Sequence, residues 1–226
     1  MDVEVKTLFI ETATPLCAIA LGVGGDVQVR ELDHDRGHVE ALIPGIQQLL
    51  SDSGITSREL DRIVVDRGPG LFTGLRVGIA TAIALADGIG AELASVTSLE
   101  LLAHGLFADG VRGDVACLVD GRRGEVFSQA FRLGDEVTVR TEPTVRTPQD
   151  VVVEYGTSGA PTTFVGDGAE KYRDLFGLLP NVALVSVSTA WLEAGVQLGS
   201  RVPAGPVTPL YLRDADAVAN FSTRQG

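Results

Sequence analysis

Positively charged and aromatic side chains are scarce in this chain of 226 residues. It has 18 Lys and Arg against 30 Asp and Glu, a formal net charge of −12, and aromatic residues make up 5% of it. A nucleic-acid-binding surface needs clustered Lys and Arg to neutralise phosphates, and often aromatic rings on which bases stack. We therefore expect another chain to supply most of the contacts in any role that involves nucleic acid.

Cysteine and long uncharged apolar runs are also scarce. The 2 cysteines, Cys17 and Cys117, each lie in an apolar, strand-like run, which predicts buried free thiols in a reducing compartment. The first residues, MDVEVKTLFIE, are acidic where a signal peptide is basic. No uncharged apolar run reaches the roughly 18 residues of a membrane span. The sequence thus predicts a soluble, cytoplasmic protein without a membrane segment.

The most distinctive stretch runs from Ile63 to Gly90. A β-branched strand ends near Asp66, and the turn at 68–70 follows, because Gly tolerates a positive φ and Pro fixes its own φ. A helix-period apolar pattern comes next, with Thr73 as its predicted N-cap.

This predicted helix carries little charge and many small residues. No ionisable side chain lies between Arg76 and Asp87, and small residues recur at positions 74, 78, 82, 86 and 90. A helix that is apolar all round is buried on more than one side, and a stripe of small residues lets a second helix approach closely. We expect one side to meet its own sheet and the other to meet another helix.

The order of predicted elements occurs twice. The first half reads as strands at 7–13, 17–23 and 27–31, a helix at 38–53, a strand at 62–66, a helix at 73–89, a strand at 92–96 and a helix at 98–107. The second half reads as strands at 114–120, 125–132 and 136–141, a helix from 148, a strand at 161–165, a helix at 168–176, a strand at 182–186 and a helix at 188–200. A βββαβαβα unit that occurs twice predicts an α/β fold of two lobes.

Several motifs resemble those of the TsaB (YeaZ-type) family. The string GPGLFTGLR at 68–76 matches eight of the nine residues of the family's GPGSFTGLR, with Leu71 in place of Ser. HVEALIP at 38–44 resembles the family's HxxxLxP, DGRRGE at 120–125 resembles its DARxxE, and the residues at 166–168 resemble its GDG. The resemblance implies the duplicated actin-like ATPase (ASKHA, RNase H-like) fold. Its first lobe would span 1–108 and its smaller second lobe 109–204, with a tail at 205–226 that packs back on the first lobe.

For function, the resemblance implies a non-catalytic subunit of the complex that makes N6-threonylcarbamoyladenosine in tRNA. Such a subunit docks and stabilises a TsaD-type catalytic subunit through first-lobe helices, works with a TsaE-type ATPase and contacts tRNA only indirectly. Alone, it would form a homodimer through the same helices. The interface residues expected on these helices are His38, Leu42, Ile46, Leu49, Gly74, Leu75, Arg76, Gly78, Ile79, Ala82, Ile83 and Ala86.

Two glycine-rich turns are candidates for a nucleotide or anion site. Gly68, Gly70 and Thr73 would direct backbone N–H groups and a helix N-terminus at one spot. Gly166 and Gly168 lie at a strand–helix junction, where actin-like ATPases admit adenosine. The alternative is that both are plain turns, because the chain has no GxxxxGK[ST] loop. We expect no cofactor, apart from a nucleotide that would bind at a subunit boundary.

The sequence contains no convincing set of catalytic or metal-binding residues. Glu11 stands where actin-like ATPases hold a metal-binding Asp, and its longer side chain would displace a magnesium ion by roughly an ångström. His34 and His38 have the spacing of two ligands on one helix face, but no third ligand follows. The alternative function is a stand-alone actin-like ATPase or kinase, or a peptidase.

Two further residues leave alternatives open. Arg76 would suit either a bound anion or a carboxylate across an interface, and we favour the carboxylate because Arg is a common interface anchor. Pro44 lies six residues into the helix predicted at 38–53, so that this helix either kinks there or begins later.

Overall fold

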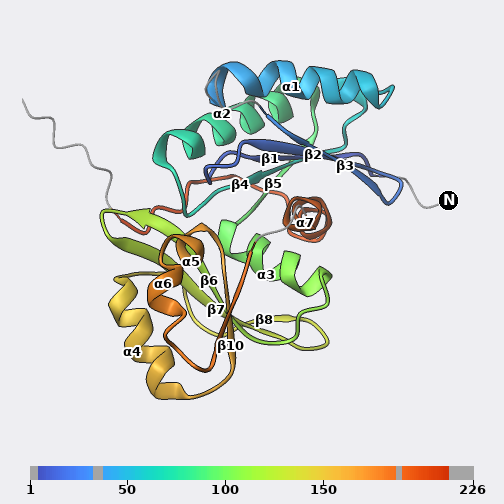
Figure 1. Cartoon of the computed structure of the whole chain (residues 1–226). Helices are drawn as coiled ribbons and strands as arrows, with labels where there is room; N and C mark the ends of the chain where they lie inside the picture. The colour runs from blue at the N-terminus through green and yellow to red at the C-terminus, as the bar shows by residue number, and fades with distance from the viewer. Residues whose placement is uncertain (1–4, 33–37, 187–189, 214–226) are drawn as a thin grey trace, which may run out of the picture.

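The computed structural model describes residues 5–32, 38–186 and 190–213, and its elements stack in five layers (Figure 1). Each of two mixed sheets is covered by helices on its outer face, and a further pair of helices separates the sheets. The first sheet is covered by α1 (His38–Asp52) and α2 (Phe72–Ile89); the middle layer holds α3 (Ser98–Ala108) and α7 (Ala190–Gly199); the second sheet is covered by α4 (Pro148–Ser158), α5 (Asp167–Lys171) and α6 (Arg173–Phe176).

The first sheet has the strand order β3-β2-β1-β4-β5. Its central strand β1 pairs antiparallel with β2 and parallel with β4, and every residue of β1 and β4 is buried. Strands covered on both faces are expected to be apolar throughout, as these largely are. The bounds are β1 Thr7–Glu11, β2 Ala18–Val23, β3 Asp26–Glu31, β4 Arg62–Asp66 and β5 Glu92–Val96.

The second sheet repeats this arrangement with the order β11-β10-β6-β7-β8. Strand β6 pairs antiparallel with β7 and parallel with β10, as β1 does with β2 and β4. The duplicated βββαβαβα order is therefore confirmed, whereas the lobe boundaries stay a prediction. The bounds are β6 Gly113–Arg122, β7 Glu125–Leu133, β8 Val137–Val139, β10 Thr162–Val165 and β11 Val182–Val185.

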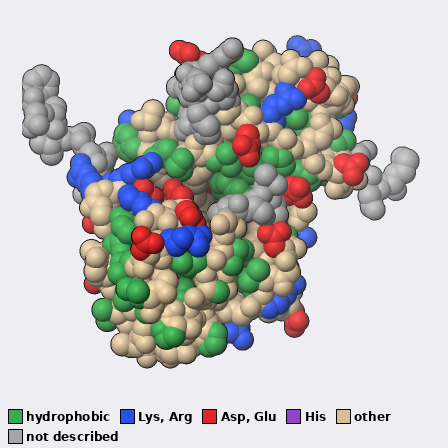
Figure 2. Space-filling model, viewed as in Figure 1, with side chains coloured by type: hydrophobic (Ala, Val, Ile, Leu, Met, Phe, Trp, Pro, Cys, Tyr) green, Lys and Arg blue, Asp and Glu red, His purple; other side chains and the backbone are tan. Residues whose placement is uncertain are grey.

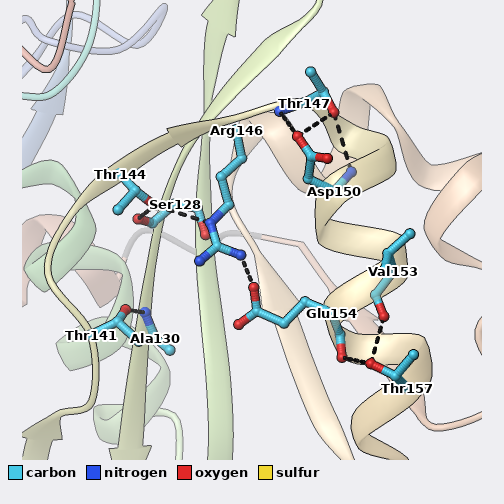
Figure 3. A network of polar contacts seen from close by, with 10 residues as sticks. All are labelled: Ser128, Ala130, Thr141, Thr144, Arg146, Thr147, Asp150, Val153, Glu154 and Thr157. Carbon is cyan, nitrogen blue, oxygen red and sulfur yellow. Dashed lines mark hydrogen bonds and ion pairs between the residues drawn. The ribbon is translucent and has the colours of Figure 1, made fainter.

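The second half departs from the predicted elements in two places. An extra strand, β9 (Thr144–Arg146), pairs with β7 and leads directly into α4. The helix expected at 168–176 is two short helices, α5 and α6, that meet at Tyr172. At the start of α4, the Thr147 hydroxyl accepts from the Asp150 N–H, and Arg146 forms an ion pair with Glu154 one turn further along (Figure 3). These polar contacts fix α4 to the sheet edge.

Apolar residues gather in three clusters that follow the layers. The largest lies between the two sheets and includes Phe9, Phe131 and Trp191, so that both lobes share it. One cluster lies under α1 and α2, and another lies under α4 to α6 around Phe164 and Phe176. Because the middle layer packs on both sheets, burial there joins the two lobes into one folded unit.

Much of helix α2 remains exposed. By length and composition alone it could cross a membrane, yet only 33% of its 18 residues are buried. The sequence analysis predicted no segment long and apolar enough to cross a membrane, because Arg76 and Asp87 interrupt the uncharged run. One flank of α2 packs on the first sheet, so the exposed part is its opposite flank.

Candidate docking face and the carboxylate sites

The inner flank of α2 lies against its own sheet. A Cβ placed on Gly78 would lie 2.2 Å from Thr12 Oγ1, and the Thr12 hydroxyl donates to the Gly74 carbonyl at 2.8 Å. The small residues therefore let α2 approach its own sheet rather than a second helix. This corrects the expectation that the following residues offer their side chains to a partner, because the chain's own atoms bury them: Gly74, Leu75, Gly78, Ile79, Ala82 and Ala86.

The prediction that residues on the inner flank of α1 contact a partner is corrected in the same way. Leu42, Ile46 and Leu49 are at most 3% exposed and belong to the apolar cluster between α1, α2 and the first sheet. The helix begins at His38 and runs through Pro44, so the alternative of a later start is excluded. The side chain of His38, like the whole of His34, lies outside the described residues.

The outer flanks of α1 and α2 form a surface that we call the outer face. Of the predicted interface residues with described side chains, Arg76 and Ile83 are the exposed ones, and Ile83 is 36% exposed. The neighbouring helix contributes Ile43, which is 42% exposed. The two helices lie side by side above the first sheet (Figure 1). We define the outer face by its exposed residues: Ile43, Pro44, Thr73, Arg76, Ala80, Ile83, Ala84 and Gly88.

The turn before α2 uses its backbone donors within the chain. The Gly68 N–H donates to Asp66 Oδ1 at 2.7 Å, and the Leu71 N–H donates to the Ala13 carbonyl at 2.6 Å. A Cβ on Gly70 would lie 2.0 Å from that same carbonyl oxygen, so glycine is required for close packing. These contacts weaken the expectation that Gly68 and Gly70 hold an anion.

Thr73 does not cap α2. The helix begins at Phe72 with Leu71 as its N-cap, and no side chain makes a capping hydrogen bond there. The prediction of a Thr73 N-cap is therefore wrong, since the close contact between the turn and Ala13 sets the start of the helix one residue earlier. Thr73 is exposed and lies on the outer face.

The second glycine-rich turn also serves packing. Gly166 has φ +109°, and a Cβ there would lie 2.2 Å from the Leu118 carbonyl oxygen, while one on Gly168 would lie 2.9 Å from the same atom. Asp167, between them, accepts the Asp120 N–H at 2.9 Å. This turn holds α5 tightly against β6, as a plain strand–helix junction does.

A pair of fully buried carboxyl groups lies where β1 and β4 end. Glu11 and Asp66 are both 0% exposed. Glu11 Oε1 accepts from the Thr14 N–H at 2.8 Å and the Thr14 hydroxyl at 3.1 Å. Asp66 accepts from the Gly68 N–H and, at 2.7 Å, from the Ser98 hydroxyl. Each carboxyl group therefore has its own set of neutral donors.

Burial and mutual repulsion perturb both groups. Loss of solvent, followed by the charge of Asp66, raises the pKa of Glu11 well above its ordinary value of 4.5. Burial likewise raises the pKa of Asp66. Glu11 Oε2 accepts no hydrogen bond from the described residues, so the raised pKa of Glu11 reflects its burial beside the Asp66 carboxyl group.

This pair does not fit the magnesium site of an actin-like ATPase. Magnesium prefers ionised oxygen ligands together with several waters, whereas these two groups are sealed from solvent and burial raises the pKa of both. Among the residues that the structure describes, no three His, Cys, Asp or Glu side chains gather closely enough to hold a metal. We therefore derive no step through a metal ion.

The second lobe places a similar pair at the corresponding edge of its sheet, with cations beside it. Asp120 Oδ1 lies 2.8 Å from Lys171 Nζ, and Asp120 Oδ2 lies 3.1 Å from Arg122 Nη1. Burial raises the pKa of the neighbouring Asp167. Charged side chains gather on the left of the molecular face in Figure 2, where the two lobes meet. Here the positive side chains of Lys171 and Arg122 lie against Asp120.

The sequence reading missed three residues of these sites: Asp66, Ser98 and Lys171. A signal for Asp66 was present, because two predicted strands each end in a carboxylate and neighbouring parallel strands end at the same edge of a sheet. No local pattern indicates Ser98 or Lys171, since they meet Asp66 and Asp120 only through the fold.

Comparison with protein families identifies relatives of this chain. A family model described as "TsaD: tRNA N6-adenosine threonylcarbamoyltransferase" matches residues 33–199. A Bacillus subtilis protein named tRNA threonylcarbamoyladenosine biosynthesis protein TsaB is 34% identical over 199 residues, which are 84% of this chain and 86% of that protein. An uncharacterised Mycobacterium leprae protein is 36% identical over 184 residues, which are 80% of this chain but 46% of that protein.

Among solved structures, a Pseudomonas aeruginosa protein is similar over most of its length. It is described as an uncharacterised protein with similarity to peptidase YeaZ. The TM-score is 0.79 at 26% identity, covering 92% of this chain and all of that one. The likeness extends over both lobes and the middle layer.

Proposed function

The chain belongs to the TsaB family, and from that premise we propose that it is a non-catalytic subunit in the synthesis of N6-threonylcarbamoyladenosine in tRNA. Relatives that carry this biosynthetic name support involvement in the pathway. In this role the chain docks and stabilises a TsaD-type catalytic subunit. The match to a TsaD family model supports a partner of related fold.

The exposed flank of α2 is the observation that supports docking. Between Arg76 and Asp87 this helix has no charge, and its exposed positions there include Ala80, Ile83 and Ala84. Water forms few hydrogen bonds with such a surface. Burying it in an interface contributes a favourable free energy of roughly 25 cal/mol per Å² of apolar area. Small side chains on the flank also let another helix approach closely. The docking residues are thus those of the outer face and not the buried small-residue stripe.

The carboxyl sites support a role without independent catalysis. The Glu11–Asp66 pair is sealed from solvent, with both pKa values raised by burial, and Asp120 is paired with Lys171 and Arg122. The first pair is out of reach of a metal ion or an attacking water, and ion pairs engage the carboxylate of Asp120. A stand-alone ATPase, kinase or peptidase is the alternative, and nucleotide turnover by the purified chain alone would favour it.

Further partners follow from the same proposal. A TsaE-type ATPase joins the docked pair, and without the TsaD-type subunit the outer face pairs with a second copy of the chain. The net charge of −12 leaves tRNA contacts to the other subunits, so this chain meets tRNA only indirectly. A cytoplasmic location and nucleotide at a subunit boundary remain predictions.

The test is co-elution of this chain with the TsaD-type protein of the same organism. Ile83→Glu places a charge in the middle of the outer face, and burying an unpaired charge costs several kcal/mol. We expect the wild-type chain to co-elute with the TsaD-type protein and the variant to elute separately.

A matched control uses the second lobe. Val153, on α4, is 65% exposed, so Val153→Glu makes the same chemical change away from the outer face. This variant should co-elute as the wild type does, and both variants should melt near the wild-type temperature. Co-elution of the Ile83→Glu variant at wild-type strength would refute docking through this face.

A further inference from the structure

The C-terminal segment 205–213, which we call the strap, runs along the first lobe. The Gly205 N–H donates to the Leu93 carbonyl of β5, and the Leu210 N–H donates to the Arg67 carbonyl just after β4, both at 2.8 Å. Between these points Val207 is buried in the cluster under α1 and α2. The strap is therefore a fixed part of the surface beside the start of α2.

The strap places an aromatic ring beside Arg76. The ring centroids of Tyr211 and Phe72 are 5.2 Å apart, and the Arg76 guanidinium carbon lies 3.8 Å from the Phe72 ring centroid. Arg76 Nε donates to the Tyr211 hydroxyl at 3.3 Å. The guanidinium group is thus held by a cation–π contact and by one hydrogen bond, and both contacts reduce its freedom before any partner binds.

The rest of the Arg76 guanidinium group is left for another molecule. Within the described residues no carboxylate pairs with it, and its recorded contacts are those with Phe72 and Tyr211. Its two terminal amino groups present the paired N–H donors that fit a carboxylate in bidentate geometry. Arg76 is exposed and lies on the outer face, where the stretch without charge that ends at Asp87 begins, so an acid there would lie at the edge of an apolar contact.

We propose that Phe72, Arg76 and Tyr211 form an anchor that binds an acidic side chain of the docked TsaD-type subunit. This proposal rests on the proposed function and names the chemistry of the partner: an Asp or Glu beside apolar residues. The strap completes the anchor, because Tyr211 is its only contribution from outside α2.

The anchor is also tied to the second lobe. Two residues after Tyr211, Arg213 Nη1 lies 2.7 Å from Glu125 Oε2 at the start of β7. Figure 1 shows the strap passing from the first lobe towards the hairpin of β6 and β7. The second lobe thereby holds the end of the strap and positions Tyr211 against Arg76.

Calorimetric titration with the TsaD-type protein of the same organism tests the anchor. Arg76→Gln keeps a polar side chain with an N–H donor but removes the charge, and we expect the affinity to fall at least about tenfold. Tyr211→Ala should weaken binding several-fold, because the Arg76 guanidinium group would lose the hydrogen bond that helps to fix its orientation. Arg140→Gln is the matched control, because Arg140 is an exposed arginine of the second lobe, and it should bind as the wild type does.

The salt dependence of binding distinguishes the loss of an ion pair from the loss of shape complementarity. Raising the salt from about 50 mM to about 500 mM should weaken the wild-type complex, and this dependence should be smaller in Arg76→Gln. An Arg76→Gln variant with wild-type affinity, or with reduced affinity but an unchanged salt dependence, overturns the anchor and leaves docking intact. A wild-type chain that does not bind at all overturns both the proposed function and the anchor.

Discussion

The two lobes share one order of strands and helices, yet they balance their central carboxyl groups differently. In the first lobe, Glu11 and Asp66 are fully buried, and burial raises the pKa of each. In the second lobe, Asp120 lies against Lys171 and Arg122, and both of these cations are partly exposed. The first pair is sealed from solvent, and the second lies in ion pairs that reach the surface.

The outer helices differ in a parallel way. On α2 the exposed Ile83 has Ala80 and Ala84 as neighbours, so the apolar surface continues along the helix as far as the exposed Asp87. On α4 the exposed Val153 has Gln149, Asp150 and Glu154 around it, which makes it an isolated apolar side chain of the ordinary surface kind. The exposed flank of α2 is therefore more continuously apolar than that of α4, and the proposal of docking through the first lobe depends on this difference.

The largest effect is expected where helices approach the sheets. Gly78→Leu in the first lobe should lower the free energy of unfolding by about 3 kcal/mol or more, because Thr12 leaves no space for a side chain. Gly168→Leu should do the same in the second lobe, where the Leu118 carbonyl blocks the site. Urea unfolding of the isolated chain measures both.

Gly88→Leu is the control for these substitutions. A Cβ on Gly88 would meet nothing within 4 Å, and replacing Gly in a helix stabilises it by up to about 1 kcal/mol. If Gly78→Leu were tolerated as well as Gly88→Leu, the inner and outer flanks of α2 would not differ as described.

The two carboxyl pairs should respond oppositely to neutralisation. Because the folded state raises the pKa of Glu11, the stability that this group contributes is fully present below about pH 4.5 and is lost as the pH rises through its folded pKa. The Glu11→Gln variant has no carboxyl group to ionise at this position, so it avoids the loss of stability at high pH. Its free energy of unfolding should exceed that of the wild type by on the order of 1 kcal/mol at about pH 8, and by less at about pH 5. Asp120→Asn should instead lower it by about 1 kcal/mol, because Lys171 loses its partner.

Denaturant unfolding of both variants at the two pH values measures this contrast. A Glu11→Gln chain that is less stable than the wild type at the higher pH would show that Glu11 is ionised in the folded protein. The two lobes would then balance their carboxyl groups by the same means.

The smallest effect concerns two helix caps of the same type. Thr97 caps α3 in the middle layer and Thr147 caps α4 at the edge, each in a capping box with the residue three positions later. Figure 3 shows the second of these caps. Thr97→Ala and Thr147→Ala should each cost about 1 kcal/mol. Hydrogen exchange should show that the first change speeds exchange in both lobes and the second only around α4, since α3 packs on the second sheet and on α7, which in turn packs on the first sheet. Equal effects throughout the chain would mean that the lobes unfold strictly together.

The doubled order of elements was predictable because both halves alternate apolar strands and helices with clear turn residues. The strand β9 was not, because three residues at 144–146 are too few to show a period and form a strand only by pairing with β7. The break at Tyr172 likewise lies inside a run whose residues all tolerate a helix.

The candidate site shows where a pattern stops being informative. The small residues at 74, 78, 82 and 86 correctly indicated a close contact, but periodicity alone does not say whether the neighbour is the chain's own sheet or another helix. The contact of Thr12 with the Gly74 carbonyl shows that the neighbour is the chain's own sheet. Thr12 lies 62 residues earlier in the chain than Gly74, so no local pattern reveals this contact. Arg76 was predicted from the sequence to be an interface residue, which stays a prediction, whereas Tyr211 reaches it only through the path of the strap.

Thiol labelling of a single introduced cysteine tests docking through the outer face most directly. The native Cys17 and Cys117 are both 0% exposed, and burial raises the pKa of Cys17 to about 11, so neither competes for the reagent. In a complex with the TsaD-type protein shown to be fully formed, we expect Ala84→Cys to be labelled much more slowly than in the free chain, and Val153→Cys at an unchanged rate. An Ala84→Cys chain that is labelled equally fast when free and when bound would contradict the account.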